Sequence, residues 1–232
     1  MQNITLFSAL YKDFWPFNEI LNVPNNRCFT VDHLGVLDLA KQQSLLVFWG
    51  GQDIHPSIYN ASRCVFSGAT FGKDLGMRDK LEIAIYKKAV KLGIPILGIC
   101  RGSQLVCALN GGKLVQHVTG HGGDHMINTS DGKQFMVTST HHQMMFPIGN
   151  FELLGWSTIK RSNTYMGEGL HQIKECHMVD WKEPEIVFYP ETKTLAVQGH
   201  PEYLRKSEEF PQYVIQLLKD KLNVGKKPDS GV

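Results

Sequence analysis

Residues 94–104, IPILGICRGSQ, contain a strand, a sharp turn and the start of a helix. Residues 94–99 are a short apolar run typical of a buried strand, and residues 101–110 predict a helix that two glycines end. The same alternation precedes them, with an apolar run at 45–49 and an amphipathic helix at 78–91. Alternating strands and helices require crossover connections. We therefore predict an α/β fold with a mainly parallel central sheet covered by helices on both faces.

The rest of the chain predicts additions to this sheet rather than a second domain. Residues 113–181 are rich in β-branched residues and turns, so we expect antiparallel strands there. Another apolar run occupies residues 195–197, and residues 214–222 predict a closing helix. Because no repeat or linker divides the chain, we predict a single domain over residues 1–232 with a flexible tail at 224–232.

Composition indicates a soluble globular protein and argues against several classes. The 232 residues include 24 Lys+Arg and 22 Asp+Glu, so the formal net charge is +2, without a dense basic cluster. This balance gives no electrostatic basis for binding nucleic acid or an anionic membrane. No apolar run approaches the roughly 18 residues that span a bilayer, and no signal-peptide pattern opens the sequence. The five cysteines are irregularly spaced without a C-x-x-C pair, which favours a reducing, cytoplasmic setting.

Cys100 is the candidate nucleophile. It lies at the strand-to-helix turn between Gly98 and Gly102, and this G-x-C-x-G pattern lets the backbone pass closely while the turn exposes the nucleophile. A thiol at a helix N-terminus is stabilised as the thiolate. The N–H of Arg101 points to where an oxyanion would form, and a second donor is expected at residues 50–51. A buried structural cysteine remains the alternative at this point.

His200 is the best candidate for a base. Pro201 biases His200 toward extended backbone, so the side chains of His200 and Glu202 point the same way. Glu202 can then orient the imidazole and stabilise its positive charge. An isolated H-x-E is common by chance, but together with Cys100 it completes a nucleophile, a base and an orienting acid.

Five segments of this chain resemble one known superfamily. They are GGQDIHPSIY at 50–59, RDKLE at 78–82, PILGICRGSQ at 95–104, STHHQ at 139–143 and VQGHPE at 197–202. On these segments the chain resembles the class I glutamine amidotransferases, and most of all the γ-glutamyl hydrolases of the γ-glutamyl-γ-aminobutyrate hydrolase type. The resemblance implies a flavodoxin-like three-layer sandwich with small antiparallel additions. Because little chain precedes the strand at residue 45, the N-terminal βα units are expected to be abbreviated.

The resemblance also implies roles for individual residues. Cys100 is the nucleophile, His200 the general base and acid, and Glu202 its partner. Gly51 and Arg101 supply the oxyanion N–H groups. The substrate-binding residues are Gly50, Gln104, His141, His142 and Gln143. No cofactor is expected.

Some features leave the reading open. Gly199 stands where relatives often have an aromatic residue, which could widen or loosen the site beside His200. Residues 183–190 lack the Asp-Gly turn and following acidic residue typical of the hydrolases, so the substrate is not identified. Residues 78–82 allow two interpretations, a solvated ion-paired helix start or direct contact with substrate.

His117, His121 and His125 are spaced by four, which on a helix would place metal ligands on one face. The intervening glycines argue against a helix, so we predict a polar loop near the mouth of the active site and no metal.

Three functions remain. The favoured one is a cysteine-nucleophile hydrolase of γ-glutamyl amide bonds that forms a γ-glutamyl thioester on Cys100. The alternative is a glutaminase subunit that takes glutamine and delivers ammonia to a separate synthetase or ligase. The third is a non-catalytic binding protein. The expected partners are a small γ-glutamyl substrate or glutamine and, under the alternative, the synthetase. The oligomeric state is open, with a homodimer as one option.

Overall fold

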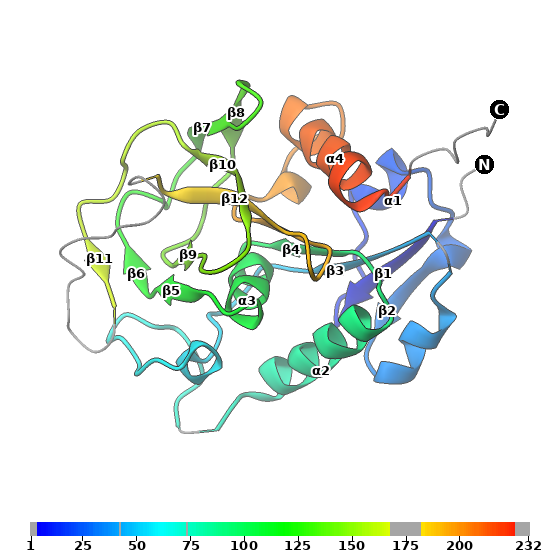
Figure 1. The fold of residues 1–232 in the computed structure, drawn as a ribbon, viewed down its shortest axis with the longest axis horizontal. Coiled ribbons are helices and arrows are strands. Elements are labelled where there is room, and N and C mark those ends of the chain that lie inside the picture. The colour runs from blue at the N-terminus through cyan, green and yellow to red at the C-terminus, as the bar shows by residue number, and fades with distance from the viewer. Residues whose placement is uncertain (1–3, 42, 73, 168–181, 226–232) are drawn as a thin grey trace.

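The fold is organised around one nine-stranded sheet. A computed structural model describes residues 4–41, 43–72, 74–167 and 182–225 (Figure 1). The strand order of the sheet is β2-β1-β3-β4-β13-β12-β10-β7-β8. The predicted α/β fold, with a mainly parallel central sheet, covering helices and antiparallel additions, is confirmed.

Five neighbouring strands form the parallel part of the sheet. They are β2 (Cys28–Val31), β1 (Thr5–Ala9), β3 (Ser44–Phe48), β4 (Ile96–Ile99) and β13 (Thr194–Val197). Every residue of β1, β3, β4 and β13 is buried, as expected where helices cover both faces of a parallel sheet. The carboxyl ends of these strands meet at one edge, which is where open α/β sheets place their sites.

Antiparallel strands extend the sheet beyond β13. They are β12 (Pro184–Tyr189), β10 (Glu152–Ser157), β7 (His125–Thr129) and β8 (Gln134–Val137). Two small antiparallel pairs lie apart from it. β6 (His117–Val118) pairs with β11 (Tyr165–Met166), and β5 (Lys113–Val115) pairs with β9 (Met144–Phe146). All of these except β12 lie in the region where the sequence predicted antiparallel additions.

Helices cover the two faces of the parallel strands (Figure 1). α2 (Met77–Lys91) and α3 (Arg101–Leu109) lie on one face, and α1 (Phe17–Ile20) and α4 (Glu209–Leu222) lie on the other. The alternation along β3 shows why: Leu45 and Val47 join the core under α4, whereas Leu46 and Phe48 join the core under α2 and α3. The short crossovers around α1 agree with the expected abbreviation of the N-terminal units.

The C-terminal region differs from its prediction in two places. α4 begins at Glu209, five residues before the predicted start at 214. Pro211 lies in its first turn, where the missing N–H costs no helical hydrogen bond. Of the predicted tail at 224–232, Val224 is buried and its N–H donates to the Leu218 carbonyl, so it belongs to the packed core. Residues 226–232 lie outside the described residues.

Within the described ranges, none of the helices has the length and apolar character that crossing a membrane requires.

Candidate active site

Cys100 lies at a tight elbow between β4 and α3. Its backbone φ of 49° is in the left-handed region that non-glycine residues rarely adopt. A Cβ on Gly98 would lie 2.6 Å from the Gly102 carbonyl oxygen, and one on Gly102 would lie 2.3 Å from the Phe48 carbonyl oxygen. Only glycine therefore permits this turn, and strain of this kind is characteristic of functional sites.

His200 joins Cys100 at the carboxyl ends of β4 and β13. Its Nδ1 lies 2.7 Å from Glu202 Oε1, and its Nε2 lies 3.1 Å from the Thr140 hydroxyl. Burial alone would lower the pKa of His200. Hydrogen bonds to Cys100 and Glu202 and the charges of both groups outweigh burial and raise the pKa to about 10. The imidazolium form of His200 is thereby favoured. The three predicted triad residues thus lie together.

Further residues, which the sequence did not single out, fix the position of His200. Its N–H donates to the Thr138 carbonyl at 3.2 Å, and the Thr138 hydroxyl donates to the His200 carbonyl at 2.8 Å. The Tyr203 ring stacks on the imidazole with centroids 4.3 Å apart. Thr140 was visible in the STHHQ segment, but nothing in its spacing indicated contact with His200.

The Gly50–Gly51 turn packs directly against the triad. A Cβ on Gly50 would lie 2.8 Å from His200 Cε1, which explains the glycine there. Gly51 has a φ of +136°, outside the range most residues adopt. The guanidinium of Arg78 donates to the carbonyls of Trp49 and Gly50 at 3.1 and 3.0 Å. Arg78 therefore fixes the turn that carries one predicted oxyanion donor.

A buried ion-pair network connects this turn to the elbow. The Arg101 guanidinium donates to both Asp79 and Glu82, and its Nε donates to the Gln52 carbonyl at 2.7 Å. Glu82 also accepts from Arg78 Nε at 3.0 Å. Asp79 and Glu82 are 4% and 0% exposed. The start of α2 is therefore neither a solvated ion-paired helix start nor part of the pocket lining. Its buried carboxylates instead bind Arg101, the residue that follows Cys100 at the elbow.

A pocket of about 200 Å³ opens beside Cys100, the predicted nucleophile. Its size suits a small acyl group, since pockets for drug-sized ligands measure about 300–1,000 Å³. Gln104 Nε2 donates to the Gln143 carbonyl at 3.2 Å, so the elbow helix and the predicted 141–143 segment form one wall. The lining residues are Gly51, Asp53, Cys100, Gln104, Thr140, His141, His142, Gln143, His200 and Tyr203.

Of the predicted substrate residues, Gln104, His141, His142 and Gln143 line the pocket, Gly50 does not, and Asp53 is an addition. His142 Nε2 lies 3.1 Å from Asp53 Oδ1, and this hydrogen bond raises the pKa of His142. His117 Nδ1 lies 3.3 Å from His142 Nδ1. His117 therefore lies next to the pocket. It is separate from His121 and His125, although the three histidines are evenly spaced in the sequence.

Gly199 does not open the site. A Cβ there would lie 3.2 Å from the Thr138 carbonyl oxygen and from Val137 Cβ, and 3.6 Å from the Phe210 ring. Neighbouring groups therefore fill the space beside this glycine.

Comparison with known proteins places the chain in a family. Residues 36–202, which include the elbow, the network and the triad, match the peptidase C26 family. The chain belongs to this family. As a peptidase C26 member, it is 27% identical over 194 residues to YvdE of Lactococcus lactis, named as a glutamine amidotransferase-like protein, and the match covers 75% of this chain and 72% of YvdE.

Two further likenesses of this peptidase C26 chain bear on its fold and partners. The carbamoyl phosphate synthase small chain of Pectobacterium atrosepticum is 28% identical over 121 residues, covering 52% of this chain and 27% of that protein. The structure of a glutamine amidotransferase from Thermotoga maritima superposes with a TM-score of 0.57 at 16% identity, covering 96% of this chain and 85% of that one. The chain is thus glutamine amidotransferase-like, and its narrower resemblance to γ-glutamyl-γ-aminobutyrate hydrolases stays a prediction.

Proposed function

We propose that the protein hydrolyses γ-glutamyl amide bonds through a γ-glutamyl thioester on Cys100. The observation that carries the proposal is the strained elbow of Cys100, which lines the same small polar pocket as His200. A buried structural cysteine would need neither the backbone strain nor a base with its own carboxylate partner. Cys107, which lies within α3, is such a buried structural cysteine, because burial raises the pKa of its thiol to about 11.

The proposed reaction uses each group of the triad. The Cys100 thiolate attacks the δ-carbonyl carbon, and the N–H groups of Arg101 and Gly51 stabilise the oxyanion. The His200 imidazolium donates its proton to the leaving amine as the C–N bond breaks, which leaves the acyl group as a thioester. Neutral His200 then takes a proton from water, hydroxide attacks the thioester, and glutamate leaves as the thiolate re-forms. Glu202 stabilises the imidazolium and fixes its orientation throughout.

The pocket offers contacts to the two charged groups that distinguish a γ-glutamyl amide from an ordinary peptide. The free α-carboxylate and α-ammonium groups of a γ-glutamyl substrate require polar partners in the pocket wall near Cys100. Gln104 and the segment from His141 to Gln143 are proposed to form this wall, with the carboxylate of Asp53 at the same pocket and Gly50 next to the lining residue Gly51. No cofactor takes part in this sequence of steps.

A second candidate is a glutaminase subunit that delivers ammonia to a synthetase. One observation favours it: large apolar side chains are exposed on the loop before α2 and at the first residue of α2, close in sequence to the pocket residue Asp53. Phe66, Phe71 and Met77 are 51%, 85% and 79% exposed. Phe66 stacks on His117, which contacts pocket residue His142. The similarity to a carbamoyl phosphate synthase small chain is consistent with a partner at such a surface.

The deciding experiment measures turnover of the purified chain alone on glutamine and on a panel of γ-glutamyl amides at neutral pH. A stand-alone hydrolase turns over at least one γ-glutamyl amide, with a rate that follows the leaving amine. Both Cys100→Ala and His200→Ala remove this activity. A well-folded wild-type protein that is alkylated by a glutamine-analogue chloroketone yet turns over none of these substrates would refute the stand-alone hydrolase and favour the subunit.

A further inference from the structure

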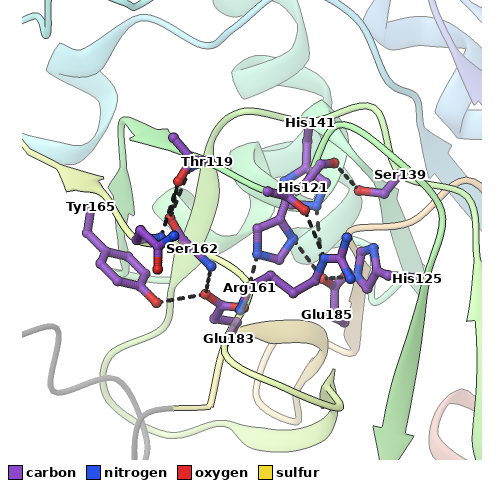
Figure 2. A network of polar contacts seen from close by, with 12 residues as sticks. Thr119, His121, His125, Ser139, His141, Arg161, Ser162, Tyr165, Glu183 and Glu185 are labelled. Atoms are coloured by element: carbon purple, nitrogen blue, oxygen red, sulfur yellow. Dashed lines mark hydrogen bonds and ion pairs between the residues drawn. The ribbon is translucent and has the colours of Figure 1, made fainter.

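Three histidines and two glutamates form a buried cluster behind the pocket wall. His121 comes from the loop before β7, His125 from the start of β7 and His141 from the pocket segment. Glu185 lies on β12 and Glu183 directly before it. All five side chains are at most 2% exposed. Figure 2 shows the imidazole rings gathered around Glu185.

Each imidazole has one nitrogen facing away from the centre of the cluster, and that nitrogen is hydrogen-bonded. His121 Nε2 lies 3.1 Å from Glu183 Oε2. His125 Nδ1 lies 3.2 Å from the Gly123 carbonyl oxygen, and His141 Nδ1 lies 2.7 Å from the Gln143 carbonyl oxygen. All three outer partners are acceptors. When the outer nitrogen of a neutral ring carries the proton, the inner nitrogen presents a lone pair.

The inner nitrogens all face the Glu185 carboxylate. His125 Nε2, His121 Nδ1 and His141 Nε2 lie 2.9, 3.5 and 4.0 Å from Glu185 Oε1. Three lone pairs and a carboxylate are all acceptors. His121 Nδ1, His141 Nε2 and Glu185 Oε2 have no hydrogen-bond partner. Buried acceptors that converge without a donor need a cation between them.

Protons alone do not complete this cluster. An imidazolium at His121 could donate to both glutamates, and a protonated His125 could donate to Glu185 Oε1. His141 Nε2 and Glu185 Oε2 would still lack partners. A metal ion would bind the inner nitrogens of all three histidines and one carboxylate oxygen of Glu185 at once.

We propose that His121, His125, His141 and Glu185 bind one divalent transition-metal ion, with Zn²⁺ as the ion that best suits this ligand set. Imidazole nitrogens and a carboxylate are ordinary zinc ligands. Ligands about 2.0–2.2 Å from a tetrahedral ion lie roughly 3.3 Å from one another. One ligand atom from each of His121, His125 and Glu185 lies within 4.8 Å of the other two, and His141 Nε2 lies 4.0 Å from Glu185 Oε1, so the four ligands would have to move closer together around the ion.

The surroundings have the features of a metal site. Metal-bound histidines commonly donate their other ring N–H to a carboxylate or a backbone carbonyl, and the outer nitrogen of each of these three lies within hydrogen-bond distance of such a group. Glu183, which accepts from His121, is itself fixed by the N–H groups of Arg161 and Ser162 and by the Tyr165 hydroxyl. Four protein ligands without solvent exposure suit a structural ion rather than a catalytic one.

The ion would join the antiparallel extension to the active site. His125 and Glu185 lie on β7 and β12, whereas His141 lines the pocket. The glycines between His117, His121 and His125 argue against a helix there, so no metal was expected from the sequence. The fold instead brings the ligands together across strands.

The test is the metal content of the untagged full chain, purified without chelator from cells grown with added Zn²⁺. Wild type is expected to hold about one zinc per chain, and His125→Ala at least fivefold less. Three controls should keep the metal: His33→Ala at the surface, His117→Ala beside the pocket, and Cys100→Ala. Wild type that holds less than about 0.1 zinc overturns the proposal, as does zinc that survives in His125→Ala but is lost in Cys100→Ala or His117→Ala.

Titration of metal-free wild type covers the case in which His125→Ala fails to fold. One equivalent of Zn²⁺ should raise the Tm by several degrees and then saturate. One equivalent of Co²⁺ should give the intense visible absorption of a four-coordinate site, and Glu185→Gln should weaken this binding at least tenfold. A metal-free protein whose Tm and Co²⁺ spectrum do not respond shows that the cluster holds protons only, and this result overturns the proposal.

Discussion

Glu82 is the residue whose loss should disturb both proposed oxyanion donors at once. Its side chain is fully buried and contacts both Arg78, which fixes the Gly50 carbonyl, and Arg101 of the elbow. Glu82→Gln keeps the shape of the side chain and removes its charge. The variant therefore tests the support of the site without touching the pocket.

The magnitudes follow from burial. Removing one partner of a buried ion pair costs about 3–5 kcal/mol. Asp79 stays paired with Arg101, so we expect the free energy of unfolding to fall by about 3 kcal/mol. Because loss of a single oxyanion donor lowers kcat by about 10²–10³-fold, displaced donors should lower kcat by about 10²-fold. Alkylation of Cys100 should persist, since His200 and Glu202 are unchanged.

Denaturant unfolding at constant slope measures the stability, and amine release measures kcat. The control is Asp38→Asn. This change breaks the ion pair between Asp38, which is 65% exposed, and Lys88 of α2, the helix that also carries Glu82. Exposed pairs contribute about 0–1 kcal/mol, so this variant should keep wild-type kcat and nearly wild-type stability. A Glu82→Gln enzyme that unfolds more easily yet retains full kcat would show that the network supports the fold and not the oxyanion donors.

Three further predictions test the rest of the site. Cys100→Ala should abolish turnover with little change in unfolding, whereas Cys107→Ala should keep kcat and lose about 1 kcal/mol of stability; the reverse pattern would exclude Cys100 as nucleophile. Glu202→Gln should lower the pKa of His200, which burial lowers but Cys100 and Glu202 raise to about 10, so the alkaline limb of kcat/KM should move to lower pH. The folded-state pKa of His200 lies above the ordinary value of about 6.5, so the stabilisation from its charged form is full below pH 6.5 and is lost toward pH 10. The free energy of unfolding of wild type should therefore fall more between these pH values than that of Glu202→Gln. Superimposable pH profiles of the two proteins would contradict the pairing of His200 with Glu202. Gly50→Ala would place a Cβ 2.8 Å from His200 Cε1. It should lower kcat/KM by about 10²-fold, because a displacement of the reacting groups by about 1 Å costs about that factor in rate. The control Gly122→Ala, with no atom within 4 Å of its Cβ, should keep wild-type kcat/KM.

Local pattern made the elbow predictable. The apolar runs at β3 and β4, the helix after Cys100 and the pair His200 and Glu202 all lie within short segments whose periodicity and glycines define their geometry. The triad then needed only the topology of a parallel sheet, which places strand ends together.

What could not be predicted depends on contacts between distant residues. Glu82 lies 19 positions before Arg101, and His125 lies 60 positions before Glu185, so no spacing in the sequence indicates either contact. β1 and β2 were not singled out, because short strands near one terminus offer little periodicity.

The most direct test of Cys100 as the nucleophile is the attachment site of a glutamine-analogue chloroketone. Trypsin separates residues 92–101, which contain Cys100 as their only cysteine, from residues 102–113, which contain Cys107. We predict one label per chain on peptide 92–101, slowed by excess glutamine and absent in Cys100→Ala. A label on any other cysteine, or unchanged labelling of Cys100→Ala, would contradict a thioester on Cys100.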